Sequence, residues 1–279
     1  MPEHLVFSHH QITPLLAKDA VPVRSLSPDL GLSEIQVHRV SSGWAFPDGA
    51  ILTEAQINLI HRDQKSCFVF VDGQLEKIET FSSRTNRYYS LIPTPGAPTM
   101  LISGIPMHRI KDTTPDKDTR QKLKALGKPF GRILDTATGL GYTAIMAAQT
   151  ADLVVTIEFD PTVHEICRHN PWSAELFTRP NILPLIGDSA DLVAAFPDGS
   201  FAAVIHDPPT FALAGAMYAF EFYQHLYRIL KPGGRLFHYI GNPEKRYGAT
   251  TGRGVVDRLS QAGFRVMAKP RAFGVLAVK

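Results

Sequence analysis

The sequence predicts an α/β fold, in which a mainly parallel sheet is covered by helices on both faces, preceded by a small β-rich domain. Two observations support this fold class. From Arg132 onward, short apolar runs alternate with stretches of helical spacing. Before Arg132, short strand-like runs are separated by Asp-Gly and Pro-Gly turns. We therefore place a β-rich domain at residues 1–112 and the α/β domain at residues 113–279.

Within the N-terminal domain, three runs rich in β-branched and aromatic residues are expected to be strands. They are residues 32–37, 67–71 and 88–92. A helix is expected over residues 53–61, because Thr53 and Gln56 have the spacing of a capping box. A second helix, over residues 116–126, is expected to lead into the α/β domain.

The α/β domain contains seven expected strands: residues 132–135, 153–158, 181–186, 202–206, 235–239, 264–269 and 272–278. Between them, three segments have the length and apolar spacing of covering helices: residues 142–149, 162–169 and 219–230. Only Pro270 and Arg271 separate the last two strands, which is too short for a crossover helix. These two strands should therefore form an antiparallel hairpin at one side of the sheet.

Composition excludes several classes of protein. Hydrophobic residues make up 44% of the 279 residues, which excludes general disorder. The apolar runs are far shorter than the ~20 residues that cross a bilayer, and the N-terminus lacks the pattern of a secretory signal. We therefore expect a cytoplasmic protein without a membrane span.

Net charge and cysteine content bear on whether the protein binds nucleic acid or a metal ion and whether it forms disulfides. The net charge of +3 does not favour nucleic acid as a partner, although it leaves room for a local basic patch. Cys67 and Cys167 lie far apart and lack metal-ligand spacing. The sequence therefore predicts neither a disulfide scaffold nor a metal site.

The strongest local signal is the segment Ile-Leu-Asp-Thr-Ala-Thr-Gly-Leu-Gly-Tyr-Thr-Ala at residues 133–144. In this segment a strand ends at Asp135, and a turn containing Gly139 and Gly141 opens a helix. Glycine allows the backbone to pass close to a ligand at such a turn. The next strand ends at Glu158, 23 residues after Asp135, where a ribose diol would be held.

Two further strands also end at polar groups. Gly187-Asp188-Ser189 follows the third strand, and His206-Asp207-Pro208-Pro209 closes the fourth. Single acids often do no more than cap helices or end strands. Four such ends in consecutive strand–helix units instead favour a nucleotide-like cofactor.

This set of strand ends resembles the class I S-adenosylmethionine-dependent methyltransferases, from about Arg132 to Lys279. The resemblance implies a Rossmann-like class I methyltransferase fold with seven strands and S-adenosyl-L-methionine as the cofactor. It places the methionine part at the glycine turn, the ribose hydroxyls at Glu158 and the adenine amino group at Asp188. The implied cofactor-binding residues are Asp135, Thr136, Ala137, Gly139, Gly141, Tyr142, Glu158, Asp160, Asp188, Ser189 and Asp207.

The chain departs from the full family motif at Ala137, where the first glycine often stands. A closer resemblance is to a group of predicted archaeal methyltransferases, and it spans nearly the whole chain. Its segments are residues 105–109, 135–143, 206–209 and 237–243. NAD is the main competing cofactor, because its fingerprint also joins a glycine turn to an acid about 20 residues on. The acid before the glycines and the terminal hairpin both fit the methyltransferase pattern better.

Asp207-Pro208-Pro209 followed by Phe211 resembles the (Asp/Asn)-Pro-Pro-aromatic motif of methyltransferases that act on nitrogen, although Thr210 intervenes here. Asp207 is the expected catalytic residue, because its carboxylate can accept hydrogen bonds from an amine and aim the nitrogen lone pair. The alternative is a Pro-Pro loop that only ends the strand. The expected substrate-binding residues are Met107, His108, Arg109, Pro208, Pro209, Phe211 and Tyr218.

His206 is the second catalytic candidate. A neutral imidazole can take a proton from an ammonium group at neutral pH, which would make His206 a general base. A structural role for this strand-end histidine is an equal alternative. For His238, the structural role is favoured.

The function expected from these residues is methylation of a nitrogen of a small molecule with S-adenosylmethionine. One alternative is that the cofactor donates an aminocarboxypropyl group or cyclises to azetidine-2-carboxylate, releasing methylthioadenosine. An RNA-directed methyltransferase or RNA-binding module is less favoured. The expected partner is a small-molecule amine or the cofactor itself, and the terminal hairpin and β-rich domain offer edges for a homodimer.

Overall fold

The computed structural model describes residues 5–17, 19, 21–211, 214–242 and 246–279. The chain divides into two compact units. The first contains the residues up to Asp116 together with Thr162–Ala174, and the second contains Lys117–Pro161 and Glu175–Lys279. Within the first unit, Trp172 joins residues 162–174 to the N-terminal part, because its Nε1 donates a 3.1 Å hydrogen bond to the Leu30 carbonyl.

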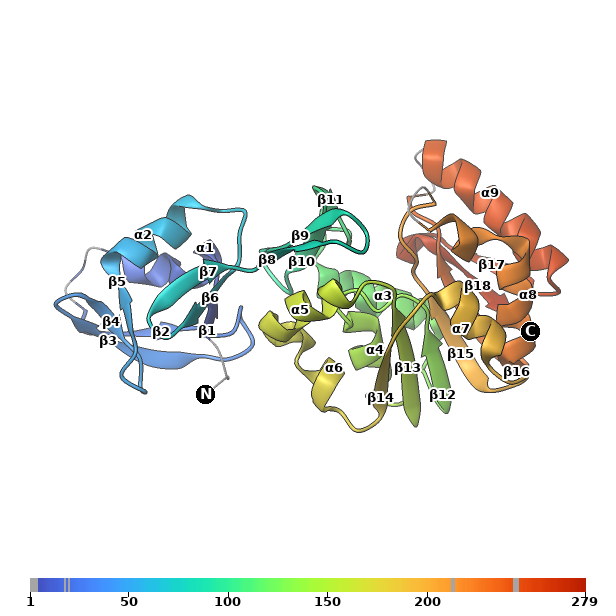
Figure 1. The fold of residues 1–279 in the computed structure, drawn as a ribbon, viewed down its shortest axis with the longest axis horizontal. Helices are drawn as coiled ribbons and strands as arrows, with labels where there is room; N and C mark the ends of the chain where they lie inside the picture. Colours follow the sequence, from blue (N-terminus) through green and yellow to red (C-terminus); the bar gives the residue numbers. More distant parts are fainter. Residues whose placement is uncertain (1–4, 18, 20, 212–213, 243–245) are drawn as a thin grey trace. The chain divides into compact units, whose positions relative to one another are not determined.

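The described residues of the first unit form three small antiparallel sheets, as expected for a β-rich region (Figure 1). The first sheet has the order β1 (Leu5–Phe7), β6 (Phe68–Val71) and β7 (Gln74–Lys77). The second has the order β2 (Val23–Leu26), β3 (Ile35–Val40), β4 (Gly43–Ala45) and β5 (Ile51–Thr53). The third has the order β11 (Ile105–Pro106), β10 (Thr99–Ile102), β9 (Arg87–Ile92) and β8 (Glu79–Ser82). The short helices at its N-terminal end are α1 (His9–Ile12), η1 (Thr13–Leu16) and α2 (Glu54–Arg62).

Helix α2 confirms the helix expected over residues 53–61. The Thr53 hydroxyl accepts a hydrogen bond from the Gln56 N–H, and the Gln56 side chain accepts one from the Thr53 N–H. This reciprocal capping box satisfies two of the N–H groups at the helix start. The inner face of α2 buries Ile57 and Ile60 in the apolar core that surrounds Trp44.

The strand expected at residues 32–37 is displaced along the chain. The observed strand is β3, Ile35–Val40. The cause is Asp29, whose Oδ1 accepts hydrogen bonds from the N–H groups of Leu32 and Ser33 at 3.0 and 2.8 Å. These backbone groups therefore belong to a turn built on a side chain, and the ladder begins after it.

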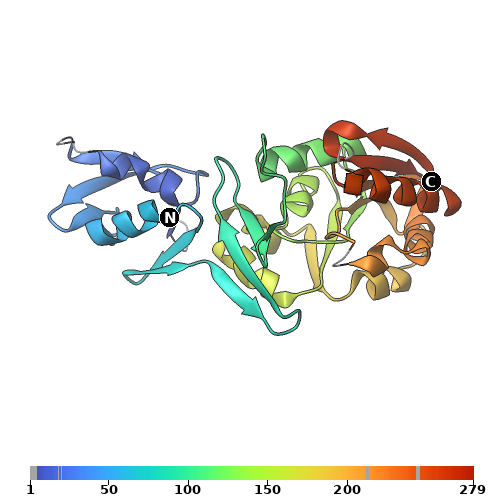
Figure 2. The same cartoon turned by 90° about the horizontal axis from the view of Figure 1, so that it is seen from above.

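The second unit contains a seven-stranded sheet, as expected. Its strand order is β14 (Ile182–Ile186), β13 (Leu153–Glu158), β12 (Arg132–Asp135), β15 (Phe201–His206), β16 (Leu230–Tyr239), β18 (Gly274–Val278) and β17 (Arg265–Lys269). Neighbours from β14 to β16 pair in parallel, whereas β18 is antiparallel to both β16 and β17. The terminal hairpin is thus confirmed, at the opposite edge from β14 (Figures 1 and 2).

The α-helices that follow are α3 (Pro115–Leu126), α4 (Tyr142–Ala147), α5 (Pro161–His169), α6 (Glu175–Thr178), α7 (Ser189–Ala195), α8 (Phe220–Ile229) and α9 (Arg246–Gln261). Short 3-10 helices are η2 (Pro171–Ser173), η3 (Gly215–Tyr218) and η4 (Pro270–Ala272). Because of η4, the last strand begins at Gly274 and not at Ala272. Among the described residues, no helix has the length and apolar character needed to cross a membrane.

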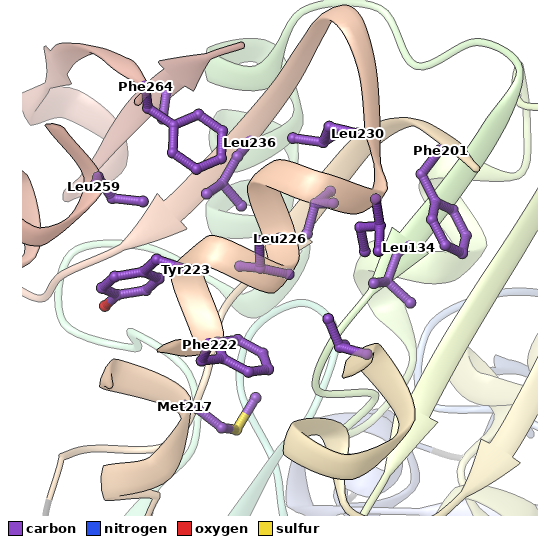
Figure 3. Close-up of a cluster of buried hydrophobic side chains, with 14 of the residues drawn as sticks. Leu134, Phe201, Met217, Phe222, Tyr223, Leu226, Leu230, Leu236, Leu259 and Phe264 are labelled. Carbon is purple, nitrogen blue, oxygen red and sulfur yellow. The ribbon is translucent and has the colours of Figure 1, made fainter. Parts of the chain in front are cut away.

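Both faces of the parallel sheet are buried. Successive residues of a strand point to opposite faces, yet Ile133 and Leu134 in β12 are both fully buried, as are Ala203 and Val204 in β15. On one face, α8 packs Phe222 and Leu226 into a cluster with Leu134 and Leu236 (Figure 3). A parallel sheet with two covered faces presents its functional groups at the strand ends.

Candidate active site

The four polar strand ends predicted from the sequence lie at one edge of the sheet in the second unit. Strands β14, β13, β12 and β15 are parallel neighbours, so their carboxyl ends share that edge. Backbone hydrogen bonds join the loops that follow them: the Thr136 N–H donates to the Ile205 carbonyl at 3.0 Å, and the Gly187 N–H donates to the Glu158 carbonyl at 2.9 Å. These hydrogen bonds link neighbouring strand ends along this edge of the sheet.

The turn after β12 requires both of its glycines. Gly139 and Gly141 have φ angles of 52° and 77°, in the left-handed region that side chains with a Cβ disfavour. Gly141 is the N-cap residue of α4, and a Cβ on it would lie 3.0 Å from Cδ2 of Leu176. Tyr142, the first residue of α4, is buried. The chain thus passes tightly over the sheet edge and starts a helix there.

Glu158 is bound to this turn. Its Oε2 accepts a hydrogen bond from the Gly139 N–H at 3.0 Å, and its Oε1 accepts one from the Asp160 N–H at 3.1 Å. Desolvation raises the pKa of Glu158 to about 7, even though both backbone hydrogen bonds favour the ionised form. Asp160 itself is buried, so two acids lie close together at the end of β13.

Asp135 supports the turn from beneath. It is fully buried, and its Oδ2 accepts hydrogen bonds from the hydroxyls of Thr143 and Thr156 at 2.8 and 3.2 Å. Burial raises the pKa of Asp135 to about 7. These contacts connect β12, β13 and α4 at one carboxyl group. Ala137, in the same turn, packs against the apolar core.

Asp188 and Ser189 start helix α7. Asp188 is the N-cap residue, and its Oδ1 accepts a 2.8 Å hydrogen bond from the Ala190 N–H. The Ser189 hydroxyl donates a 2.6 Å hydrogen bond to the carbonyl of Thr136. The third strand end is thereby fastened to the glycine turn.

His206 lies fully buried in a polar network. Its Nε2 lies 3.1 Å from the Met217 carbonyl, which only accepts, so Nε2 carries the proton. Its Nδ1 then accepts from the Thr136 hydroxyl, at 2.7 Å. Burial lowers the pKa of His206 to about 3. With both ring nitrogens engaged, this arrangement favours the structural alternative over the general base.

His238 has a similar environment. Its Nδ1 donates to the Tyr239 carbonyl at 2.8 Å, and its Nε2 accepts from the Tyr223 hydroxyl at 3.0 Å. Burial lowers the pKa of His238 well below its ordinary value. The two imidazole rings lie 4.2 Å apart, centroid to centroid, within an aromatic cluster. Both rings therefore belong to the core beneath the strand ends.

Asp207 has a partner that sequence reasoning missed. Nζ of Lys122 lies 2.5 Å from Oδ2 of Asp207 and 2.9 Å from Oδ2 of Asp118. The Lys122 side chain is 3% exposed and that of Asp118 is fully buried. Nζ of Lys122 also lies 4.6 Å from the centroid of the Tyr239 ring, within cation–π range. The only signal in the sequence was the spacing of Asp118 and Lys122 by one helical turn.

The loop after Asp207 presents both apolar and polar groups. Pro208 is buried and Pro209 is exposed, and the Pro209 carbonyl accepts a 2.9 Å hydrogen bond from the Tyr218 hydroxyl. The Phe211 ring is 53% exposed and packs edge-on against Tyr218, with centroids 5.6 Å apart. An exposed aromatic side chain therefore stands four residues beyond Asp207.

Met107, His108 and Arg109 belong to the first unit. His108 is fixed there by Thr99, whose Oγ1 lies 2.9 Å from the His108 Nδ1 and accepts from the His108 N–H at 3.3 Å. The Met107 N–H donates to the Met100 carbonyl. Their assignment to the substrate site stays a prediction.

Comparison with known proteins finds one matching family model and several relatives. Residues 134–238 match the family model described as a methyltransferase domain. The uncharacterized protein MJ1233 of Methanocaldococcus jannaschii is 41% identical over 286 residues, covering 99% of this chain and 97% of that protein. Polyamine aminopropyltransferase 2 of Streptomyces coelicolor is 29% identical over 130 residues, covering 44% of this chain and 24% of that protein.

Solved structures with a similar fold include spermidine synthases. The crystal structure of a spermidine synthase in complex with the transition-state analogue AdoDATO superposes with a TM-score of 0.59 at 20% identity, covering 76% of this chain and 79% of that chain. The spermidine synthase from Thermotoga maritima superposes with a TM-score of 0.56, also at 20% identity, covering 76% of this chain and 77% of that chain. At 20% sequence identity, these superpositions show that the fold is shared.

Proposed function

Because the chain belongs to the class I methyltransferase superfamily, in one family with the M. jannaschii protein, we propose that it is an S-adenosylmethionine-dependent transferase that methylates a nitrogen of a small molecule. One observation carries the proposal. The glycine turn after β12 is hydrogen-bonded to the acid at the end of β13, next to the end of β15 that bears Asp207. A cofactor cradle and a nucleophile-orienting carboxylate thus share one edge of the sheet.

The donor set at this edge fits S-adenosylmethionine. Glu158 offers a carboxylate to two ribose hydroxyls, and Asp188 offers one to the adenine amino group. The turn of Gly139 and Gly141 brings backbone close to the methionine part, with Asp135, Thr136, Ala137, Tyr142, Asp160 and Ser189 forming its support. When bound, the cofactor supplies an electrophilic carbon beside a sulfonium.

Asp207 is the proposed catalytic residue. Its carboxylate accepts a hydrogen bond from the amine substrate and holds the nitrogen lone pair toward the electrophilic carbon. The amine reacts in its neutral form. With the cofactor bound, the nitrogen–carbon bond would form as the carbon–sulfur bond breaks, the electron pair would stay on sulfur, and the proton released from nitrogen would go to solvent. Phe211, Tyr218 and the two prolines provide the apolar wall on the acceptor side.

His206 receives a positioning role in this proposal. Its ring holds the Thr136 hydroxyl on one side and the Met217 carbonyl on the other. It thereby connects the turn after β12 with the segment that carries Tyr218. The general-base role considered from the sequence is not part of the proposal.

Transfer of a larger alkyl group is the second candidate. It is supported by the similarity to an aminopropyltransferase and by the fold shared with spermidine synthases. The same sheet edge would then orient an amine toward a different carbon on the sulfonium. An aminopropyl or aminocarboxypropyl group would be transferred, or the cofactor would cyclise, and methylthioadenosine would be released.

A product assay separates the two candidates. Purified protein is incubated with S-adenosylmethionine or its decarboxylated form, each with and without a panel of di- and polyamines, and products are identified by mass spectrometry. S-adenosylhomocysteine together with a methylated amine supports the proposal. Methylthioadenosine supports the second candidate. Failure to bind either nucleoside in calorimetry would overturn both.

A further inference from the structure

Helix α3 carries two buried charged side chains, Asp118 and Lys122. Lys122 is 3% exposed and Asp118 is fully buried, and they lie one helical turn apart on the same side of the helix. Removing an ammonium group from water is costly unless it is paired. The buried Lys122 ammonium group is paired with two carboxylates, those of Asp118 and Asp207, which fix its position.

The arrangement at Asp207 is asymmetric. Lys122 binds Oδ2 of Asp207 at 2.5 Å, and within the described part of the chain no donor reaches Oδ1. The Asp207 side chain is 21% exposed, whereas Lys122 beneath it is almost completely covered. One carboxylate oxygen is thus held from inside the protein, which leaves the other to a ligand.

We propose that Lys122, anchored by Asp118 and by the ring of Tyr239, is a positioning residue that fixes the Asp207 carboxylate at the end of β15 and keeps it ionised for an amine substrate. This inference rests on the proposed function, because it gives Asp207 the task of orienting an amine. The reaction itself needs no contact between Lys122 and substrate.

The charges around Asp207 define the effect of each substitution. Asp118 and Lys122 approach it from α3, Asp135 lies at the end of β12, and Tyr239 lies on β16. Burial raises the pKa of Asp207, Lys122 lowers it, and Asp118 raises it. Lys122 and Asp118 therefore act on Asp207 with opposite signs.

The test measures the titration of the Asp207 carboxyl group by carbon NMR of the full-length protein, with the signal assigned by its loss in Asp207→Asn. Lys122→Met should move the titration midpoint up by about one pH unit or more. In Lys122→Arg the midpoint should stay at the wild-type value, and in Asp118→Asn it should move to lower pH. Lys124→Met, which changes an exposed lysine of the same helix, is the matched control and should leave it in place.

The pH dependence of kcat should shift in the same direction as the titration of Asp207 in each variant. The acidic limb of the kcat profile should shift upward in Lys122→Met, while the Kd for S-adenosylmethionine stays within about three-fold. If Lys122→Met does not fold, the downward shift in Asp118→Asn and the retained profile of Lys122→Arg still decide the question. Unshifted titration in a folded Lys122→Met or in Asp118→Asn would overturn the inference. Shifted titrations in a protein that transfers no alkyl group would instead overturn the proposed function alone.

Discussion

The backbone N–H of Gly139 donates a 3.0 Å hydrogen bond to Oε2 of Glu158, joining the turn after β12 to the end of β13. Gly139 has a left-handed φ of 52°, a conformation that glycine adopts without strain. Desolvation raises the pKa of this Glu158 carboxylate to about 7.

Replacement of Glu158 by Ala should weaken S-adenosylmethionine binding about ten-fold or more, because two charge-assisted hydrogen bonds to ribose are lost. Isothermal titration calorimetry measures the change. Glu175→Ala, which removes a half-exposed carboxylate of the same unit, is the control and should bind as the wild type does. Equal affinities for the Glu158→Ala variant and the wild type would show that the ribose lies elsewhere.

Cofactor affinity should depend on pH through Glu158. In the free protein its pKa is about 7, and ribose hydroxyls donate to the ionised form. Binding should therefore weaken as pH falls below about 7, by up to about ten-fold per pH unit. In Glu158→Gln, which cannot ionise, this part of the dependence should vanish. Parallel curves for the two proteins would exclude Glu158 as the titrating group.

Asp207→Asn should lower kcat by roughly 10² while the Kd for the cofactor changes by less than about three-fold, because the side chain orients the amine and contacts the cofactor little. The Asn carbonyl can still accept from Lys122, which limits the damage to folding. Asp198→Asn is the matched control at an exposed site of the same unit. A folded Asp207→Asn with wild-type kcat on the amine identified in the product assay would refute the assignment.

The free energy of unfolding should decrease as the pH falls, because His206 is buried in its neutral form. Its pKa is about 3 in the folded protein and near 6.5 when unfolded, so the unfolded chain binds the extra proton between these values. The free energy of unfolding should thus decrease by about 1.4 kcal/mol per pH unit from this group as pH falls below 6.5. Urea titrations at several pH values should show a shallower slope for His206→Gln. The exposed His38→Gln should keep the wild-type slope.

Gly141→Ala should destabilise the protein more than Gly199→Ala. Both residues have left-handed φ angles, 77° and 62°, so both alanines carry the same backbone strain. At Gly141 the new Cβ also meets Leu176, whereas at Gly199, apart from its two chain neighbours, no atom of the described residues lies within 4 Å. We expect an additional loss of about 1 kcal/mol at Gly141, measured by urea unfolding. Equal losses at the two positions would mean that Leu176 moves aside freely.

The sequence by itself determined the α/β unit, its terminal hairpin and the four polar strand ends. Each depends on local information: strand and helix periodicity, the short link at Pro270 and Arg271, and the glycine turn at residues 139–141. Once the strands are parallel neighbours, their carboxyl ends must share one edge. The approximate grouping of Asp135, Glu158, Asp188 and Asp207 therefore follows from chain order and strand direction.

Only the tertiary structure decided which of these groups have buried partners. Lys122 and Asp207 are 85 residues apart, and their contact depends on how α3 packs against the sheet. The contact of the His206 Nε2 with the Met217 carbonyl likewise depends on how the segment that carries Met217 packs against β15. Side-chain pairing across the chain is set by packing geometry, and local periodicity carries no information about which side chains will meet.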